Sequence, residues 1–243
     1  MKRSYIIFRT PQDLAEAFAV DLADKIKKAA DGKEYLNIAL SGGNTPKILF
    51  TVLAERYSQS LDWCYVHFFW VDERCVPPED PESNFGMTKQ FLLDKIKIPR
   101  KNIHRMRGEN DPGREAERYS EEILKYVCKG KFFPVFDIMI LGIGDDGHTA
   151  SIFPGNTEML SSEKICGTSV HPVSGQIRIT LTGKVINNSK EIFFLVTGEK
   201  KSDIVYKIIS KSSDTVTFPA ANIFSVHGKT IWLLDEESGR FIK

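Results

Sequence analysis

Short apolar runs alternate with longer segments of helical periodicity along most of the chain. The apolar runs lie at 35–40, 66–71, 136–141, 177–181, 191–196 and 230–234. The helical segments lie at 11–30, 47–60, 84–95, 115–127 and 200–211. This alternation predicts β-α-β units and a mainly parallel sheet. No repeat or low-complexity tract divides the chain. We therefore expect an α/β fold in which residues 1–243 form a single doubly wound domain, with helices on both faces of the sheet.

The composition favours a protein that folds on a core of its own. The 243 residues are 42% hydrophobic, and 33 Lys and Arg balance 32 Asp and Glu. Because these charges nearly cancel, neither nucleic acid nor an anionic membrane is an expected partner. The four cysteines form no C-x-x-C pair, which indicates reduced thiols. No apolar run fits a signal peptide or a bilayer span, so we expect a cytoplasmic protein.

One turn places an acid and an imidazole after a predicted strand. The run 136–141 is followed by Gly142 and Gly144, and then by Asp146 and His148. Ligands bind outside the carboxyl ends of parallel strands, and histidine exchanges protons near neutral pH. Asp146 could orient the ring of His148. A structural histidine in a Gly-rich turn is the alternative. No other His or Cys stands at ligand spacing, so no metal is expected.

The segment 41–46, Ser-Gly-Gly-Asn-Thr-Pro, leads from an apolar run into a helix. Gly42 and Gly43 allow the backbone to approach a ligand, the N–H groups at the helix start point outward, and Ser41 adds a hydroxyl. These features fit an anion site. A plain strand-to-helix turn capped by Thr45 is the alternative.

Charged residues follow another apolar run, at Asp72, Glu73 and Arg74. Asp72 and Arg74 are interpreted as site residues. Beside a phosphate site, the carboxylate could act as a base or orient the substrate while the guanidinium binds the anion. For Glu73, a solvated strand end is at least as good an interpretation.

Two later cations could complete the anion site. A phosphate dianion is commonly held by two or three cations, and Arg178 and Lys201 each lie in or just beyond an apolar run. The neighbouring Lys200 is interpreted as a surface charge.

In these motifs the chain resembles the 6-phosphogluconolactonases, within a wider group that includes glucosamine-6-phosphate deaminases. The resemblance covers nearly the full length, through the segments 41–46, 71–74 with the following Pro77 and Ser83-Asn84, 107–109, 141–154, 178–182, 197–201 and 232–235. It implies hydrolysis of 6-phospho-D-glucono-1,5-lactone to 6-phospho-D-gluconate in the oxidative pentose phosphate pathway, without cofactor or metal. The implied partner is this sugar phosphate, and we expect a monomer or a weak dimer.

The resemblance also implies roles for the site residues. His148 looks like the base that takes a proton from water, with Asp146 positioning it. Arg74 looks like a contact to the phosphate or to developing negative charge, and Asp72 like a residue that binds a hydroxyl. The phosphate and sugar anchor would be formed by Ser41, Gly42, Gly43, Arg178 and Lys201.

Phe153 separates two branches of this group. The deaminases carry a glutamate at the corresponding position, where it assists ring opening. A phenyl ring cannot relay a proton, so Phe153 favours a lactonase and is expected to form an apolar wall. The alternatives are an amino-sugar phosphate deaminase or isomerase and a non-catalytic sugar-phosphate sensor.

Overall fold

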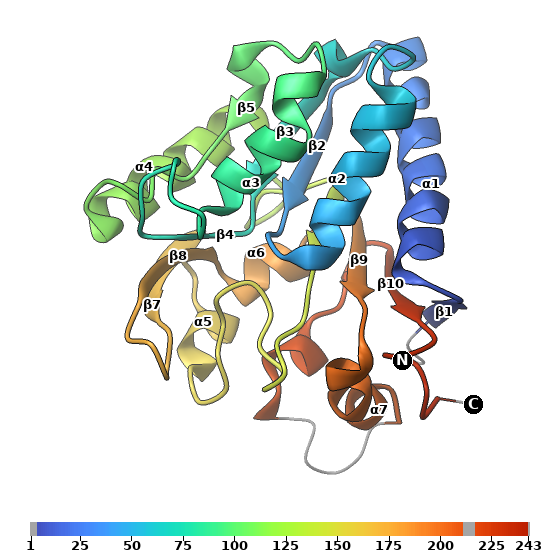
Figure 1. Cartoon of the computed structure of the whole chain (residues 1–243). Helices are drawn as coiled ribbons and strands as arrows, with labels where there is room; N and C mark the ends of the chain where they lie inside the picture. Colours follow the sequence, from blue (N-terminus) through green and yellow to red (C-terminus); the bar gives the residue numbers. More distant parts are fainter. Residues whose placement is uncertain (1–3, 211–216, 243) are drawn as a thin grey trace.

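A computed structural model describes residues 4–210 and 217–242 of the chain. Its centre is a seven-stranded parallel sheet with the strand order β1-β10-β9-β6-β2-β3-β5 (Figure 1). The strands are β1 Ser4–Phe8, β2 Leu36–Leu40, β3 Val66–Trp70, β5 Ile103–His104, β6 Ile138–Leu141, β9 Glu191–Val196 and β10 Lys229–Asp235. The predicted α/β fold is confirmed, whereas the extent of the domain, residues 1–243, stays a prediction.

Helices cover both faces of this sheet, as expected. They are α1 Pro11–Gly32, α2 Asn44–Tyr57, α3 Asn84–Phe91, α4 Pro112–Tyr126, α5 Thr157–Ser161, α6 Gly183–Asn187 and α7 Ser202–Ser210. Side chains alternate along each strand, so Ile38 faces one buried cluster with α1 and α2, while Ala39 faces the other with α4, α6 and α7. The two clusters form a core on each side of the sheet.

All five predicted helices have different limits in the structure, and for 11–30, 47–60 and 115–127 the difference from α1, α2 and α4 is at most three residues at either end. The helix expected over 84–95 ends at Phe91 and is followed by a 3-10 turn, Leu93–Lys95. The helix expected over 200–211 begins only at Ser202, after a 3-10 turn at Glu199–Lys201. The predicted end of that helix at 211 lies outside the described residues.

A second, three-stranded sheet was not predicted. It has the order β4-β8-β7, formed by β4 Asp72–Arg74, β8 Ile177–Leu181 and β7 Cys166–Val170, and both pairings are antiparallel. The assignment of 177–181 to the parallel alternation is therefore wrong. An apolar run indicates that a strand is buried but does not specify which strand it pairs with.

The parallel register brings distant segments together at the carboxyl edge of the main sheet. Because β2 pairs with β6 through Ile38–Ile138 and Ala39–Met139, the chain leaves both strands side by side. β3 lies on the other side of β2, and its continuation donates from Val71 N to the carbonyl of Leu40 at 2.9 Å. The three polar segments recognised in the sequence therefore begin at one edge (Figure 1).

Candidate active site

A pocket of about 210 Å³ lies at this edge of the sheet. Its lining includes seven of the predicted site residues: Ser41, Gly42, Asp72, Arg74, His148, Arg178 and Lys201. It also includes Asn84, Gly142, Ile143, Gly144, Thr149 and Ala150. Two further predicted residues, Gly43 and Asp146, stand beside it: Gly43 lines an adjoining groove, and Asp146 contacts His148.

The loop after β2 is shaped by its two glycines. Gly43 is the N-cap of α2 and has a φ of 109°, a conformation that favours glycine. The alternative with Thr45 as the cap is wrong, because the Thr45 hydroxyl lies 2.7 Å from the Thr197 hydroxyl instead. Ser41 is buried and donates to the carbonyl of Ile140 at 2.9 Å, which ties this loop to β6. The loop therefore presents its backbone toward the pocket at a fixed position.

Asp146 and His148 contact each other in the turn after β6. The Asp146 carboxylate lies 2.6 Å from Nδ1 of His148 and accepts from its backbone N–H at 3.1 Å. Partial burial opposes ionisation of Asp146, but these hydrogen bonds outweigh it and lower its pKa to about 2. An ionised Asp146 accepts from Nδ1–H, which leaves Nε2 of His148 as the acceptor. Gly144 keeps the ring close, since a Cβ there would lie 2.1 Å from Nδ1 of His148.

Phe153 is buried and packs directly against the His148 ring, with the ring centroids 4.9 Å apart. Its ring also lies 5.7 Å from the guanidinium of Arg178 and 5.1 Å from the ring of His171. The side chain thus provides an apolar contact between the imidazole and a cation.

Two arginines stand directly opposite each other in the second sheet. The β4–β8 register pairs Arg74 with Arg178, an arrangement of like charges that is unfavourable without an anion. Burial and the neighbouring Arg74 lower the pKa of Arg178. The Nε atoms of both residues are buried and have no hydrogen-bond partner within the described residues. Buried donors without partners beside a pocket indicate a site for an anionic group.

The third predicted cation, Lys201, forms an ion pair with Asp145 in the turn after β6. Lys200 is exposed, in agreement with its interpretation as a surface charge. The 3-10 turn after β9 therefore directs one of two neighbouring lysines toward the pocket.

Glu73 is not a solvated strand end. Its side chain points away from the pocket, and the residue is only 1% exposed. The carboxylate accepts from the backbone N–H groups of Arg74, Asn84 and Phe85 and from the Ser83 hydroxyl at 2.7–3.1 Å. Burial raises the pKa of Glu73 to about 7 in spite of these donors. Glu73 thus anchors the start of α3.

Two residues around Asp72 were not predicted to belong to the site. Ser151 is fully buried and donates to Oδ2 of Asp72 at 2.6 Å. Asn84 Nδ2 donates to the Asp72 carbonyl at 2.9 Å and to Oδ1 at 3.3 Å. Asn84 and Ser151 both lie within segments that carry the family resemblance, 83–84 and 141–154, but the charge and glycine patterns gave neither residue a role.

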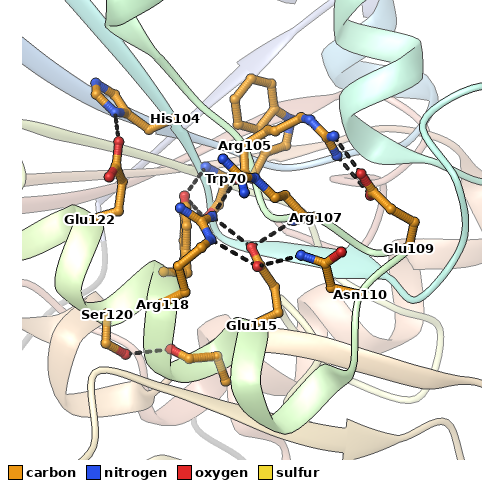
Figure 2. Close-up of polar contacts among 12 residues, drawn as sticks. Trp70, His104, Arg105, Arg107, Glu109, Asn110, Glu115, Arg118, Ser120 and Glu122 are labelled. Carbon is orange, nitrogen blue, oxygen red and sulfur yellow. Dashed lines mark hydrogen bonds and ion pairs between the residues drawn. The ribbon is translucent and has the colours of Figure 1, made fainter.

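The segment 107–109, part of the family resemblance, supports the site from behind. A Cβ at Gly108 would lie 2.2 Å from the carbonyl oxygen of Arg74, so the two backbones are in close contact. Figure 2 shows the polar network that holds this segment: buried Glu115 accepts from the backbone N–H of Arg107 at 2.7 Å and from Arg118 at 2.6 Å. The network fixes the outer side of β4.

An anion pocket beside an acid–imidazole pair, at the carboxyl edge of a parallel sheet, defines an α/β protein with an enzyme-like site for a small anionic molecule. The family model described as glucosamine-6-phosphate isomerases/6-phosphogluconolactonase matches residues 9–232, and the chain belongs to this family. The family expected from the sequence motifs is therefore confirmed.

Individual relatives match over nearly their whole length. The chain is 44% identical to the 6-phosphogluconolactonase of Haemophilus influenzae over 98% of this chain and 100% of that protein. Among solved structures, the devB protein matches with a TM-score of 0.94 at 39% identity, covering 99% of each chain. The 6-phosphogluconolactonase of Trypanosoma cruzi matches with a TM-score of 0.89 at 28% identity, covering 100% of this chain and 97% of that one.

Proposed function

We propose that the protein hydrolyses 6-phospho-D-glucono-1,5-lactone to 6-phospho-D-gluconate, with His148 activating the water. Curated relatives named 6-phosphogluconolactonase, at 39–44% identity over at least 92% of their length, support a lactone-hydrolysing enzyme. The observation that carries the proposal is the contact of ionised Asp146 with Nδ1 of His148, beside two unpaired arginine donors.

The proposed mechanism uses only protein groups and water. Nε2 of His148 takes a proton from water as the water oxygen attacks the lactone carbonyl carbon. Asp146 holds the ring in the required tautomer and stabilises its charged form. The tetrahedral intermediate then breaks its bond to the ring oxygen, which receives the proton from His148. The open product retains the attacking oxygen in its new carboxyl group, which releases its remaining proton to the solvent and becomes the carboxylate.

The phosphate would be held by cations on three different segments. Arg74 and Arg178 face each other across the second sheet, and Lys201 approaches from the turn after β9. Anchoring the phosphate, which does not react, would keep the carbonyl carbon in place near His148.

Phe153 favours this reaction over deamination of an amino-sugar phosphate. The ring packs against His148, where the resemblance places a glutamate in the deaminases. A solved structure of a monomeric glucosamine-6-phosphate deaminase has a TM-score of 0.81 at 21% identity, a likeness of fold only.

The test is acid release from freshly prepared lactone, corrected for spontaneous hydrolysis. We expect catalysis by the wild type, a loss of at least about 100-fold in kcat for His148→Ala, and no change for the surface variant Lys200→Ala. Unchanged catalysis in His148→Ala would refute the assigned base. Ammonia release from glucosamine 6-phosphate would favour the deaminase, and binding of the phosphosugar without turnover would favour the sensor.

We also propose that the enzyme works in the cytoplasm as a monomer or weak dimer, without nucleic-acid or membrane partners. The near balance of charge and the four free cysteines support this setting. Within the described ranges, none of the helices has the length and apolar character needed to cross a bilayer. Sedimentation over a range of concentrations would establish the oligomeric state.

A further inference from the structure

The Asp72 carboxylate is held from two sides. Oδ2 accepts from the Ser151 hydroxyl at 2.6 Å, and Oδ1 accepts from Asn84 Nδ2 at 3.3 Å. Asp72 and Ser151 are buried, yet Asp72 lines the pocket. A carboxylate oxygen accepts two hydrogen bonds, so each oxygen keeps capacity for one more donor.

Both supports of Asp72 are themselves fixed. Ser151 lies three residues after His148, its backbone N–H donates to the Thr180 hydroxyl at 3.2 Å, and its carbonyl accepts from Ser169 at 2.7 Å. Ser151 therefore connects the turn that carries the imidazole to the strand that carries Asp72.

Asn84 is the first residue of α3, whose start is anchored by buried Glu73. Its amide group lies against Gly42, because a Cβ at Gly42 would lie only 1.7 Å from Oδ1 of Asn84. Strand alternation sends Asp72 toward the pocket and Glu73 toward the helix. The orientation of Asp72 is thus set by packing rather than by the ligand.

We propose that Ser151 and Asn84 are positioning residues that hold Asp72 as an acceptor for ring hydroxyls of the substrate, so that the enzyme selects lactones by those hydroxyls. The inference rests on the proposed function. A free carboxylate would lose rotational entropy when it binds a hydroxyl, whereas one already held does not. A contact to a hydroxyl distant from the carbonyl stabilises the ground state and the transition state alike, so its loss raises KM and leaves kcat unchanged.

Ser151→Ala and Ser225→Ala form a matched pair for the test. Each variant removes one buried serine hydroxyl that donates a hydrogen bond of 2.6 Å, but Ser225 donates to the Ser189 carbonyl and only the Ser151 hydroxyl contacts Asp72. We expect both to lower the Tm. Only Ser151→Ala should raise KM, by about fivefold to tenfold, which corresponds to about 1–1.4 kcal/mol, the worth of one typical hydrogen bond, with kcat within about twofold of the wild type. Asn84→Ala should give the same KM effect and serves if Ser151→Ala does not fold.

The same variants are then assayed with lactones that lack one ring hydroxyl, at C3 or C4, the hydroxyl-bearing ring carbons that are not bonded to the carbonyl carbon. At one position or both, the wild type and Ser225→Ala should lose activity, whereas Ser151→Ala should show a smaller additional loss, because its contact to that hydroxyl is already weakened. Equal deoxy penalties in all variants, or the same KM increase in Ser225→Ala as in Ser151→Ala, would overturn the positioning role alone. A wild type that hydrolyses no lactone would overturn the proposed function and this inference together.

Discussion

Gly42→Ala tests how tightly the loop after β2 is packed against the pocket. The new Cβ would lie 1.7 Å from Oδ1 and 2.4 Å from Cγ of Asn84. Both distances are far below van der Waals contact, so the Asn84 amide has to move. The φ of Gly42 lies outside the left-handed region, so the predicted effect comes from the clash and not from backbone strain.

The loss of stability can be worked out from these contacts. Moving Asn84 breaks its hydrogen bonds of 2.9 and 3.3 Å to Asp72, each worth about 1 kcal/mol. Inserting a methyl group into a well-packed region costs about 1–3 kcal/mol more. The free energy of unfolding should therefore fall by about 3–5 kcal/mol, a large part of the stability of a typical domain.

Urea unfolding followed by circular dichroism measures this change, with Gly142→Ala as the control for stability. Gly142 lines the same pocket, but a Cβ there meets nothing within 4 Å. We expect Gly142→Ala to stay within about 0.5 kcal/mol of the wild type, and Gly42→Ala to raise KM as well as to lose stability. Equal stability of the two variants would refute the packing argument.

Three further predictions concern the base, the buried acid and the anion site. In Gly144→Ala the new Cβ would lie 2.1 Å from Nδ1 of His148, so the imidazole has to move. We expect kcat to fall by at least about 100-fold, and a variant with the kcat of the wild type would contradict this geometry. The pKa of Glu73 is raised from 4.5 to about 7, so the folded state binds more protons than the unfolded state between these values. Between pH 4.5 and 7, the free energy of unfolding of the wild type should therefore fall by about 3 kcal/mol relative to that of Glu73→Gln. A difference between the two proteins that does not change with pH would contradict this prediction. Lys201→Ala should raise KM about tenfold, while exposed Lys200→Ala should not, and equal KM values would remove Lys201 from the anion site.

The residues that the sequence marked for chemistry all end or follow apolar strands. Ser41 and Asp146 could be placed near each other before the structure was known, because parallel strands end at one edge of a sheet. The charge run at Asp72–Arg74 was a harder case. Its three side chains have three different tasks, and only the pairing of β4 with β8 shows that Arg74 faces Arg178 while Glu73 faces α3.

The sequence by itself determined the parallel α/β fold, the helices on both faces and the glycine-bounded turns, because these depend on local periodicity and backbone freedom. Only the tertiary structure decided the second, antiparallel sheet and the contacts of Asp72 with Ser151 and Asn84, which are 79 and 12 residues away in the chain. Such contacts depend on which strands pair and in what register. The sequence shows which residues are polar and need a hydrogen-bond partner when they are buried. It does not show which partner the fold provides.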